Sequence, residues 1–380
     1  MSGNKPIFFP GLNGLRALAA LSVVVFHLTR DFAEFNLSPY IFGTMPDGSP
    51  KGFAMAGYGV TIFFALSGFL ITYLLLAEKE KQEINIRNFY FRRILRIWPL
   101  YYLYLAAVLA VIFYFGFPFN GKVLLTYIFF AANFPFILEN VPHIVDTTLP
   151  FLRHYWSLGV EEQYYLFWPW VVKKIKKRLT LFVVAFIVIF NLLKIGSHFL
   201  MPQSVFAACF NVIRFDNMLI GSLGAILYFE KQPLFLQIFS HKITQAFAWF
   251  IVLLLLLNVF HVASVIDHEI LSVVTVMLII GQITVKNRLI NLDNKACDFL
   301  GKISYGMYVI HPLIIFFAAK LLKDIELPSL LKYSLVYAFV TAVTILIAWL
   351  SYTYFEKPFL RIKMKYTTIA SSNTKEGRNA

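Results

Sequence analysis

Residues 335–350 read LVYAFVTAVTILIAWL, a run without a single charged side chain. Leu181–Leu193 and Ala246–Phe260 are apolar runs of the same kind. An α-helix needs about 20 mostly apolar residues to cross the hydrocarbon core of a bilayer. These runs therefore predict membrane-spanning helices and an all-α fold.

The composition of the whole chain points the same way. Hydrophobic residues make up 59% of the 380 residues and charged residues only 14%, whereas soluble domains carry roughly 25% charged residues. A soluble protein could not keep so much apolar surface from water, but lipid can solvate it. The sequence therefore predicts an integral membrane protein.

The net charge of +14 arises from basic clusters between the spans, a pattern typical of cytoplasmic loops rather than of nucleic-acid binding. Cys209 and Cys297 form neither a disulfide framework nor a metal-ligand spacing. The N-terminus lacks a basic region followed by a small-residue cleavage site, so the first span is expected to be the insertion signal. We expect no nucleic-acid partner and no metal.

The predicted topology is a polytopic helix bundle of about ten spans. Their approximate ranges are 11–29, 57–77, 97–116, 157–172, 180–198, 205–229, 243–260, 269–285, 303–322 and 330–355.

The segment 123–138 is also apolar, but a crossing there would place the five Lys and Arg residues of 173–178 outside, against the positive-inside rule. It is therefore predicted to be re-entrant or interfacial, with Asn133 and Pro135 interrupting its helix. Both termini are then cytoplasmic. Residues 1–365 form one membrane domain in this prediction, and 366–380 form a polar, disordered tail in the cytoplasm.

The first span carries two ionisable residues, Arg16 and His27. They are eleven residues apart, which is about 1,100° of helical rotation and roughly 16 Å along the axis. They therefore share one face, with Arg16 in the cytoplasmic third and His27 near the outer end. Ionisable groups in spans are costly and mark functional sites. The alternative is that Arg16 extends to the cytoplasmic surface and His27 is interfacial.

The fourth predicted span begins with SLGVEEQYY (157–165), which places Glu161 and Glu162 at about the depth of His27. The two carboxylates point about 100° apart on a helix. One of them could orient the imidazole of His27 and raise its basicity. The alternative is an acidic pair that the helix dipole favours at an N-terminus.

The stretch FRRILRIWPLYYLY (91–104) places Arg93 and Arg96 on one helix face at the cytoplasmic surface. Two guanidinium groups in this arrangement suit a phosphate-rich ligand. Topology alone also demands basic residues at this position.

Other polar residues are weaker candidates. Arg214 and Asp216 cannot pair along one helix, although Asp216 could face a cavity. His311, before a proline, and Glu356, at the last cytoplasmic exit, are interpreted as structural anchors. Five further histidines lie in loops or at span ends and show no metal-ligand spacing with a partner; they are His143, His154, His241, His261 and His268.

Taken in order, these motifs resemble the acyltransferase-3 family of integral membrane acyltransferases, over about residues 10–362. Arg16-x10-His27, Arg93-x-x-Arg96 and SLGVEEQYY match its pattern. Further segments resemble its other spans; these are GVTIFFALSGFLI (59–71), RFDNMLIGSLGA (214–225), LGKISYGMYVIHPL (300–313) and SYTYFEKPF (351–359).

The resemblance implies an O-acyltransferase domain in residues 1–365, without the appended hydrolase-like domain that some members carry. It implies transfer of an acyl group, commonly acetyl and not amino-acyl, from cytoplasmic acetyl-CoA or another acyl-CoA. The implied acceptor is a hydroxyl of a cell-envelope glycan such as a polysaccharide or lipopolysaccharide, or of a lipid-linked sugar or small metabolite. The implied location is the cell (inner or plasma) membrane, among membrane lipids.

The depths of the residues suggest roles for them. Arg93 and Arg96 would hold the phosphates of coenzyme A, and Arg16 would polarise the thioester carbonyl or hold a phosphate. His27 would be the general base or a transient acyl carrier, oriented by Glu161 as in a catalytic triad.

A transporter or proton-coupled exchanger, with these residues as a relay, is the alternative function. The two halves of the sequence show no repeat of the kind that many transporters have.

Overall fold

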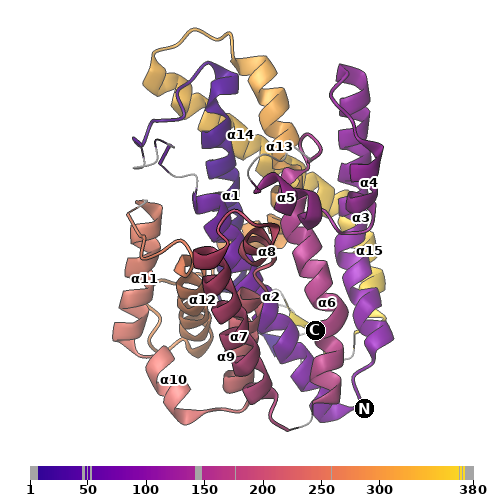
Figure 1. Cartoon of the computed structure of the whole chain (residues 1–380), viewed down its shortest axis with the longest axis vertical. Helices are drawn as coiled ribbons and strands as arrows, with labels where there is room; N and C mark the ends of the chain where they lie inside the picture. The colour runs from indigo at the N-terminus through magenta and orange to yellow at the C-terminus, as the bar shows by residue number, and fades with distance from the viewer. Residues whose placement is uncertain are drawn as a thin grey trace.

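The structure is a computed structural model that describes residues 7–44, 48, 50–51, 54–141, 148–175, 177–257, 259–367, 369 and 371–372. The described chain is a bundle of helices (Figure 1). The first helices are α1 (Leu12–Arg30), α2 (Ala54–Lys81), α3 (Ile86–Phe115), α4 (Gly121–Ile128), α5 (Asn133–Glu139), α6 (Trp156–Lys174), α7 (Leu179–Leu200) and α8 (Val205–Ile213). The others are α9 (Phe215–Phe229), α10 (Pro233–Phe239), α11 (Lys242–Leu256), α12 (Asp267–Thr284), α13 (Lys295–Leu322), α14 (Ser329–Leu350) and α15 (Lys357–Met364).

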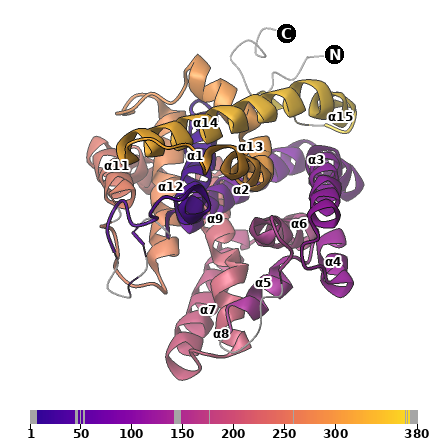
Figure 2. The same ribbon diagram turned by 90° about the horizontal axis from the view of Figure 1, so that it is seen from above.

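Helices α1 and α2 lie at the centre of the bundle (Figure 2). Helix α1 packs against α2 and α13, and α2 packs against α9, α12 and α6. Short 3₁₀ turns follow α1 (Asp31–Phe35) and precede α6 (Arg153–Tyr155), and a π-helical segment (Ser351–Glu356) joins α14 to α15. Residues on α1 therefore face the middle of the protein.

Small residues allow α2 and α9 to approach very closely. A Cβ atom on Gly68 of α2 would lie 1.9 Å from the carbonyl oxygen of Met218 on α9. A Cβ atom on Gly221 of α9 would lie 2.0 Å from the carbonyl oxygen of Ala65 on α2. Lipid tails are as apolar as leucine side chains, so packing of this kind drives helix association in membranes. The two glycines hold the centre of the bundle together.

The prediction of a polytopic membrane bundle is confirmed. Eight helical stretches of the described chain are long and apolar enough to cross a bilayer, and a ninth is the pair α10 and α11, bent by 55°. Helix α6, the other predicted span, is 19 residues long and carries Glu161, Glu162 and two terminal lysines. Its crossing stays a prediction.

The apolar segment 123–138 is interrupted, as predicted. It forms parts of α4 and α5, which are 8 and 7 residues long, too short to cross a bilayer. The amide of Asn133 exchanges hydrogen bonds with Gln163 of α6, at 3.2 and 2.8 Å. This amide pair fixes the short helices against the bundle.

The two ends of the chain meet on one face. Strand β1 (Ile7–Phe8) pairs in parallel with strand β2 (Ser371–Ser372). An even number of crossings places both ends on the same side, as the predicted topology requires. The predicted tail at 366–380 lies largely outside the described residues. At its start, however, Tyr366 stacks on Phe91 with ring centroids 5.0 Å apart.

We predict that Gly221→Ala destabilises the protein by about 1–3 kcal/mol, because its methyl group forces α2 and α9 apart. The measurement is the midpoint of thermal unfolding in detergent. Gly196→Ala on α7 is the matched control, since a Cβ atom there has no neighbour within 4 Å. It should leave the midpoint unchanged or raise it slightly. Equal losses at both positions would contradict the packing argument.

Candidate active site

Four basic side chains line a small cavity, here called the inner cavity, of about 150 Å³. Arg16 comes from α1, Arg93 and Arg96 from α3, and Lys363 from α15. Ile7 and Phe8 of β1, near the start of the chain, also line the inner cavity. The structure thus brings Arg16, Arg93 and Arg96 together, as their predicted depths suggested, and adds Lys363.

These four cations lack acidic partners. Across the described residues, no carboxylate oxygen lies within 4.0 Å of any of them. Glu161 is the single acid among the residues that line the inner cavity, and its carboxylate accepts hydrogen bonds from Ser67, at 2.5 Å, and from Tyr165. Buried charges without partners are costly, so the inner cavity is suited to an anionic ligand.

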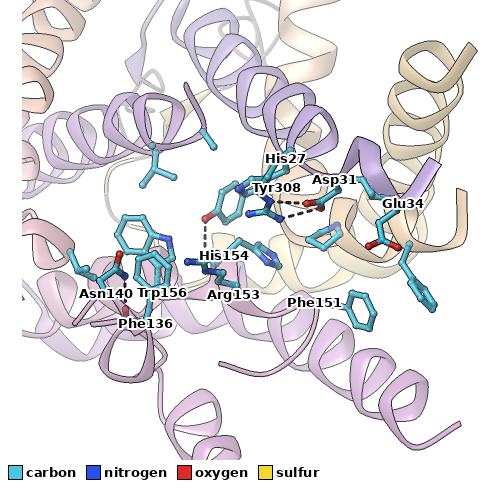
Figure 3. Close-up of a pocket in the computed structure, with 18 of the residues that line it drawn as sticks. His27, Asp31, Glu34, Phe136, Asn140, Phe151, Arg153, His154, Trp156 and Tyr308 are labelled. Atoms are coloured by element: carbon cyan, nitrogen blue, oxygen red, sulfur yellow. Dashed lines mark hydrogen bonds and ion pairs between the residues drawn. The ribbon is translucent and has the colours of Figure 1, made fainter. Parts of the chain in front are cut away.

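A second cavity, here called the outer cavity, has a volume of about 820 Å³. Ligand pockets commonly measure about 300–1,000 Å³. Figure 3 shows the imidazoles of His27 and His154 at this cavity, with the carboxylates of Asp31 and Glu34 to one side and the rings of Phe136 and Trp156 to the other. The cavity contains enough polar groups to hold a polar ligand.

The orientation of His27 is fixed by His311 of α13. The Nδ1 atom of His27 lies 2.7 Å from Nε2 of His311, and the rings are stacked with centroids 5.0 Å apart. The Nδ1 atom of His311 faces the carbonyl oxygen of Tyr308 at 2.8 Å. That nitrogen must therefore carry the proton in a neutral ring, which makes Nε2 of His311 the acceptor. His27 then donates through Nδ1, so its Nε2 atom carries the lone pair.

His154 lies beside this pair and is held by the backbone. Its Nε2–H donates to the carbonyl oxygen of Val309 at 3.0 Å, and its ring contacts His311 with centroids 5.2 Å apart. Burial, with a smaller effect from His311, holds the pKa of His154 well below its usual range. His154 is therefore neutral. Among the described residues, the carboxylates that line the outer cavity are those of Asp31 and Glu34.

One layer of side chains separates the two cavities, because Val60 and Tyr308 line both. The hydroxyl of Tyr308 lies 2.5 Å from Oγ of Ser157 and donates to the carbonyl oxygen of His154 at 2.8 Å. Val60 and Tyr308 form what we call the dividing wall. A group at this wall could be reached from both sides.

The expected pairing of Glu161 with His27 is not what the structure shows. Glu161 lies on the inner side of the dividing wall, on the face of α6 that meets Ser67 of α2. His27 lies on the outer side, where α1 packs on α13, and its partner is His311. Equal depth along the membrane normal did not imply proximity, because the two helices present these residues to different neighbours.

Sequence reasoning interpreted His311 as a structural anchor and left Lys363 and His154 unassigned. His311 is an ionisable residue inside a predicted span, and this position could have marked it as functional. Nothing in the sequence distinguished Lys363 from the other basic residues near the C-terminus.

Glu356 accepts a hydrogen bond from Ser351 at 3.2 Å and lines neither cavity. His143 lies outside the described residues, and no cluster suited to a metal ion occurs within them.

A family model described as an acyltransferase domain matches residues 9–353. The chain is 28% identical to O-acetyltransferase OatA of Staphylococcus aureus, over 93% of this chain and 57% of that protein. It is 34% identical to peptidoglycan O-acetyltransferase OatA of Listeria monocytogenes, over 43% of this chain and 24% of that protein. The chain matches two staphylococcal relatives along most of its own length, but it spans only 57–60% of their length. No solved structure matches it significantly.

We predict that Arg96→Gln leaves the ligand-free protein as stable as before, or more stable, because it removes a partly buried cation that forms no ion pair with the described residues. Arg92→Gln is the matched control on the same helix. Arg92 pairs with Glu78 at 3.1 Å and donates to the carbonyl oxygen of Tyr366 at 2.8 Å, so its loss should cost on the order of 3 kcal/mol. Thermal unfolding midpoints in detergent make the comparison. A larger loss for Arg96→Gln than for Arg92→Gln would contradict the unpaired cluster.

Proposed function

The chain belongs to the acyltransferase-3 family of membrane acyltransferases, and we propose that it transfers an acetyl group from cytoplasmic acetyl-CoA to a hydroxyl of a cell-envelope glycan. The observation that carries this proposal is the pair of cavities on either side of the dividing wall. One has unpaired cations and the other has a histidine with its lone pair free. The O-acetyltransferase relatives support the acetyl group and the glycan.

The donor would bind at the inner cavity. Arg16, Arg93, Arg96 and Lys363 supply charge for the phosphates of the coenzyme, and a guanidinium binds phosphate through two parallel hydrogen bonds. At about 150 Å³ the cavity is smaller than the roughly 300–1,000 Å³ of common ligand pockets, so the nucleotide would lie beyond it and the pantetheine arm would extend into it. The thioester would then reach the dividing wall.

Glu161 has a supporting role in this proposal. It is the sole acid that lines the inner cavity, and Ser67 and Tyr165 hold its carboxylate. It therefore offsets part of the charge of the arginines, rather than orienting His27. A catalytic role for Glu161 beside His27 is not proposed.

The chemistry would take place at His27. Its Nε2 atom takes the proton of the acceptor hydroxyl as the hydroxyl oxygen attacks the thioester carbonyl carbon. The C–O ester bond forms, the C–S bond breaks, and the departing thiolate of coenzyme A takes the proton from His27. His311 and the carbonyl oxygen of Tyr308 hold His27 in the tautomer that this step requires, much as a triad's third member does.

We expect His27→Ala to reduce the release of radiolabelled acetate or acetyl ester from acetyl-CoA at least about a hundredfold, because the general base is lost. The assay uses the full chain in detergent, with cell-wall glycan as the acceptor. His241→Ala is the control, since His241 caps α11 away from both cavities. Full activity of His27→Ala would remove this residue from the mechanism.

The same assay tests the orienting role of His311. Glutamine at 311 offers an amide oxygen to the Nδ1–H of His27, and phenylalanine offers no acceptor. His311→Gln should therefore be more active than His311→Phe by on the order of tenfold. Equal activity of the two variants would show that the hydrogen bond to His27 is not used.

A further inference from the structure

One wall of the outer cavity is a stack of two aromatic rings between two guanidinium groups. The rings of Phe136 and Trp156 lie parallel, with an interplanar angle of 7° and centroids 5.1 Å apart (Figure 3). Arg153 lies over Phe136 at 5.3 Å, and Arg214 lies over Trp156 at 5.4 Å. All four residues line the cavity. Cation–π contacts of this kind hold both guanidinium groups in place.

The two arginines differ in their partners. Arg153 forms an ion pair with Glu139 at 3.2 Å. Arg214 donates through Nε to the carbonyl oxygen of Asn211 at 2.7 Å, but its Nη1 atom is buried without a hydrogen-bond partner. No carboxylate oxygen of the described residues lies within 4.0 Å of it. Arg214 is therefore a fixed cation that forms no ion pair with the described residues.

The acidic groups near Arg214 have other partners. Glu269 pairs with Lys194, and Asp216 accepts a hydrogen bond from Asn191 at 3.4 Å. Neither of these acids lines the outer cavity. Arg214 is thus the member of this charged group that a ligand in the outer cavity could contact.

The other arginines and lysines that line the outer cavity form an ion pair, lie against aromatic rings elsewhere on its wall, or are exposed. Arg30 binds both carboxylate oxygens of Asp31, at 2.7 and 3.1 Å. Lys320 lies over the rings of Phe115 and Phe316. Glu34, the remaining acid of the lining, is exposed on the turn that carries Asp31. Lys320 and Lys323 are exposed, so Arg214 is the partly buried cation among the described lining residues that has no ion pair.

The backbone at Arg214 is also specialised. It has φ 44° and separates α8 from α9. A residue with a side chain adopts this left-handed conformation at a cost of about one to two kcal/mol, so the surrounding packing must hold it. The guanidinium is thereby positioned before any ligand binds.

We infer that the acceptor is an acidic saccharide, and that Arg214 binds its carboxylate or phosphate while His27 activates a neighbouring hydroxyl. This inference rests on the proposed function and names the chemical class of its acceptor. A guanidinium with free N–H groups pairs with either anion through two hydrogen bonds. A neutral sugar would form no ion pair with the guanidinium, so its affinity should be lower by about tenfold or more.

Binding of small probes to the full chain tests the inference. Glucuronate and glucose 1-phosphate carry the two anions on the same ring, and methyl glucoside is the neutral probe. Thermal stabilisation in detergent is measured at increasing probe concentration. We expect at least one anionic probe to bind at least tenfold more tightly than methyl glucoside. The two anionic probes distinguish a carboxylate acceptor from a phosphate acceptor.

Variants locate the site. Arg214→Gln should abolish the preference for the anionic probe, and Arg214→Lys, which keeps the charge, should retain part of it even if the glutamine variant folds poorly. Arg153→Gln is the matched control on the same stack and should keep the preference. No anionic preference, or a preference that depends on Arg96 in the inner cavity instead, would overturn the inference. His27-dependent acetyl release reports separately on the proposed function.

Discussion

The structure depends on one constraint, which is that charged side chains inside a bilayer need a partner or a polar cavity. Helix α1 carries Arg16 and His27 about three turns apart on one side, so both residues require polar surroundings within the bundle. The inner cavity and the outer cavity supply them. Because α1 lies at the centre, α2 and α13 complete both cavities and provide the dividing wall of Val60 and Tyr308.

Charge is distributed unequally across this wall. The inner cavity gathers four cations around Glu161, which suits a polyanionic donor. In the outer cavity, His27 is held by the neutral ring of His311, which in turn is held by the backbone carbonyl of Tyr308. A carboxylate partner would have added a buried charge there, at a desolvation cost that the neutral relay avoids. In the proposed mechanism, this arrangement keeps His27 close to the dividing wall without placing it among the arginines.

The sequence predicted what depends on local pattern. Apolar runs and charge clusters gave the spans, helical periodicity gave the shared face of Arg16 and His27, and the positive-inside rule identified the interrupted segment 123–138. The predicted depth of Glu161 did not identify its partner, because position along the membrane normal does not say which helix a residue faces. The bond from His27 to His311 joins residues 284 positions apart, and only the packing of α1 on α13 reveals it.

The central claim is that an acetyl group crosses the dividing wall while coenzyme A remains on the side of the arginines. Transfer across proteoliposomes of uniform orientation measures this directly, with radiolabelled acetyl-CoA supplied only on the face that carries the chain termini. The account predicts labelled acetate or acetyl ester in the opposite compartment, with coenzyme A left behind. Label that is released only into the donor's own compartment would contradict it.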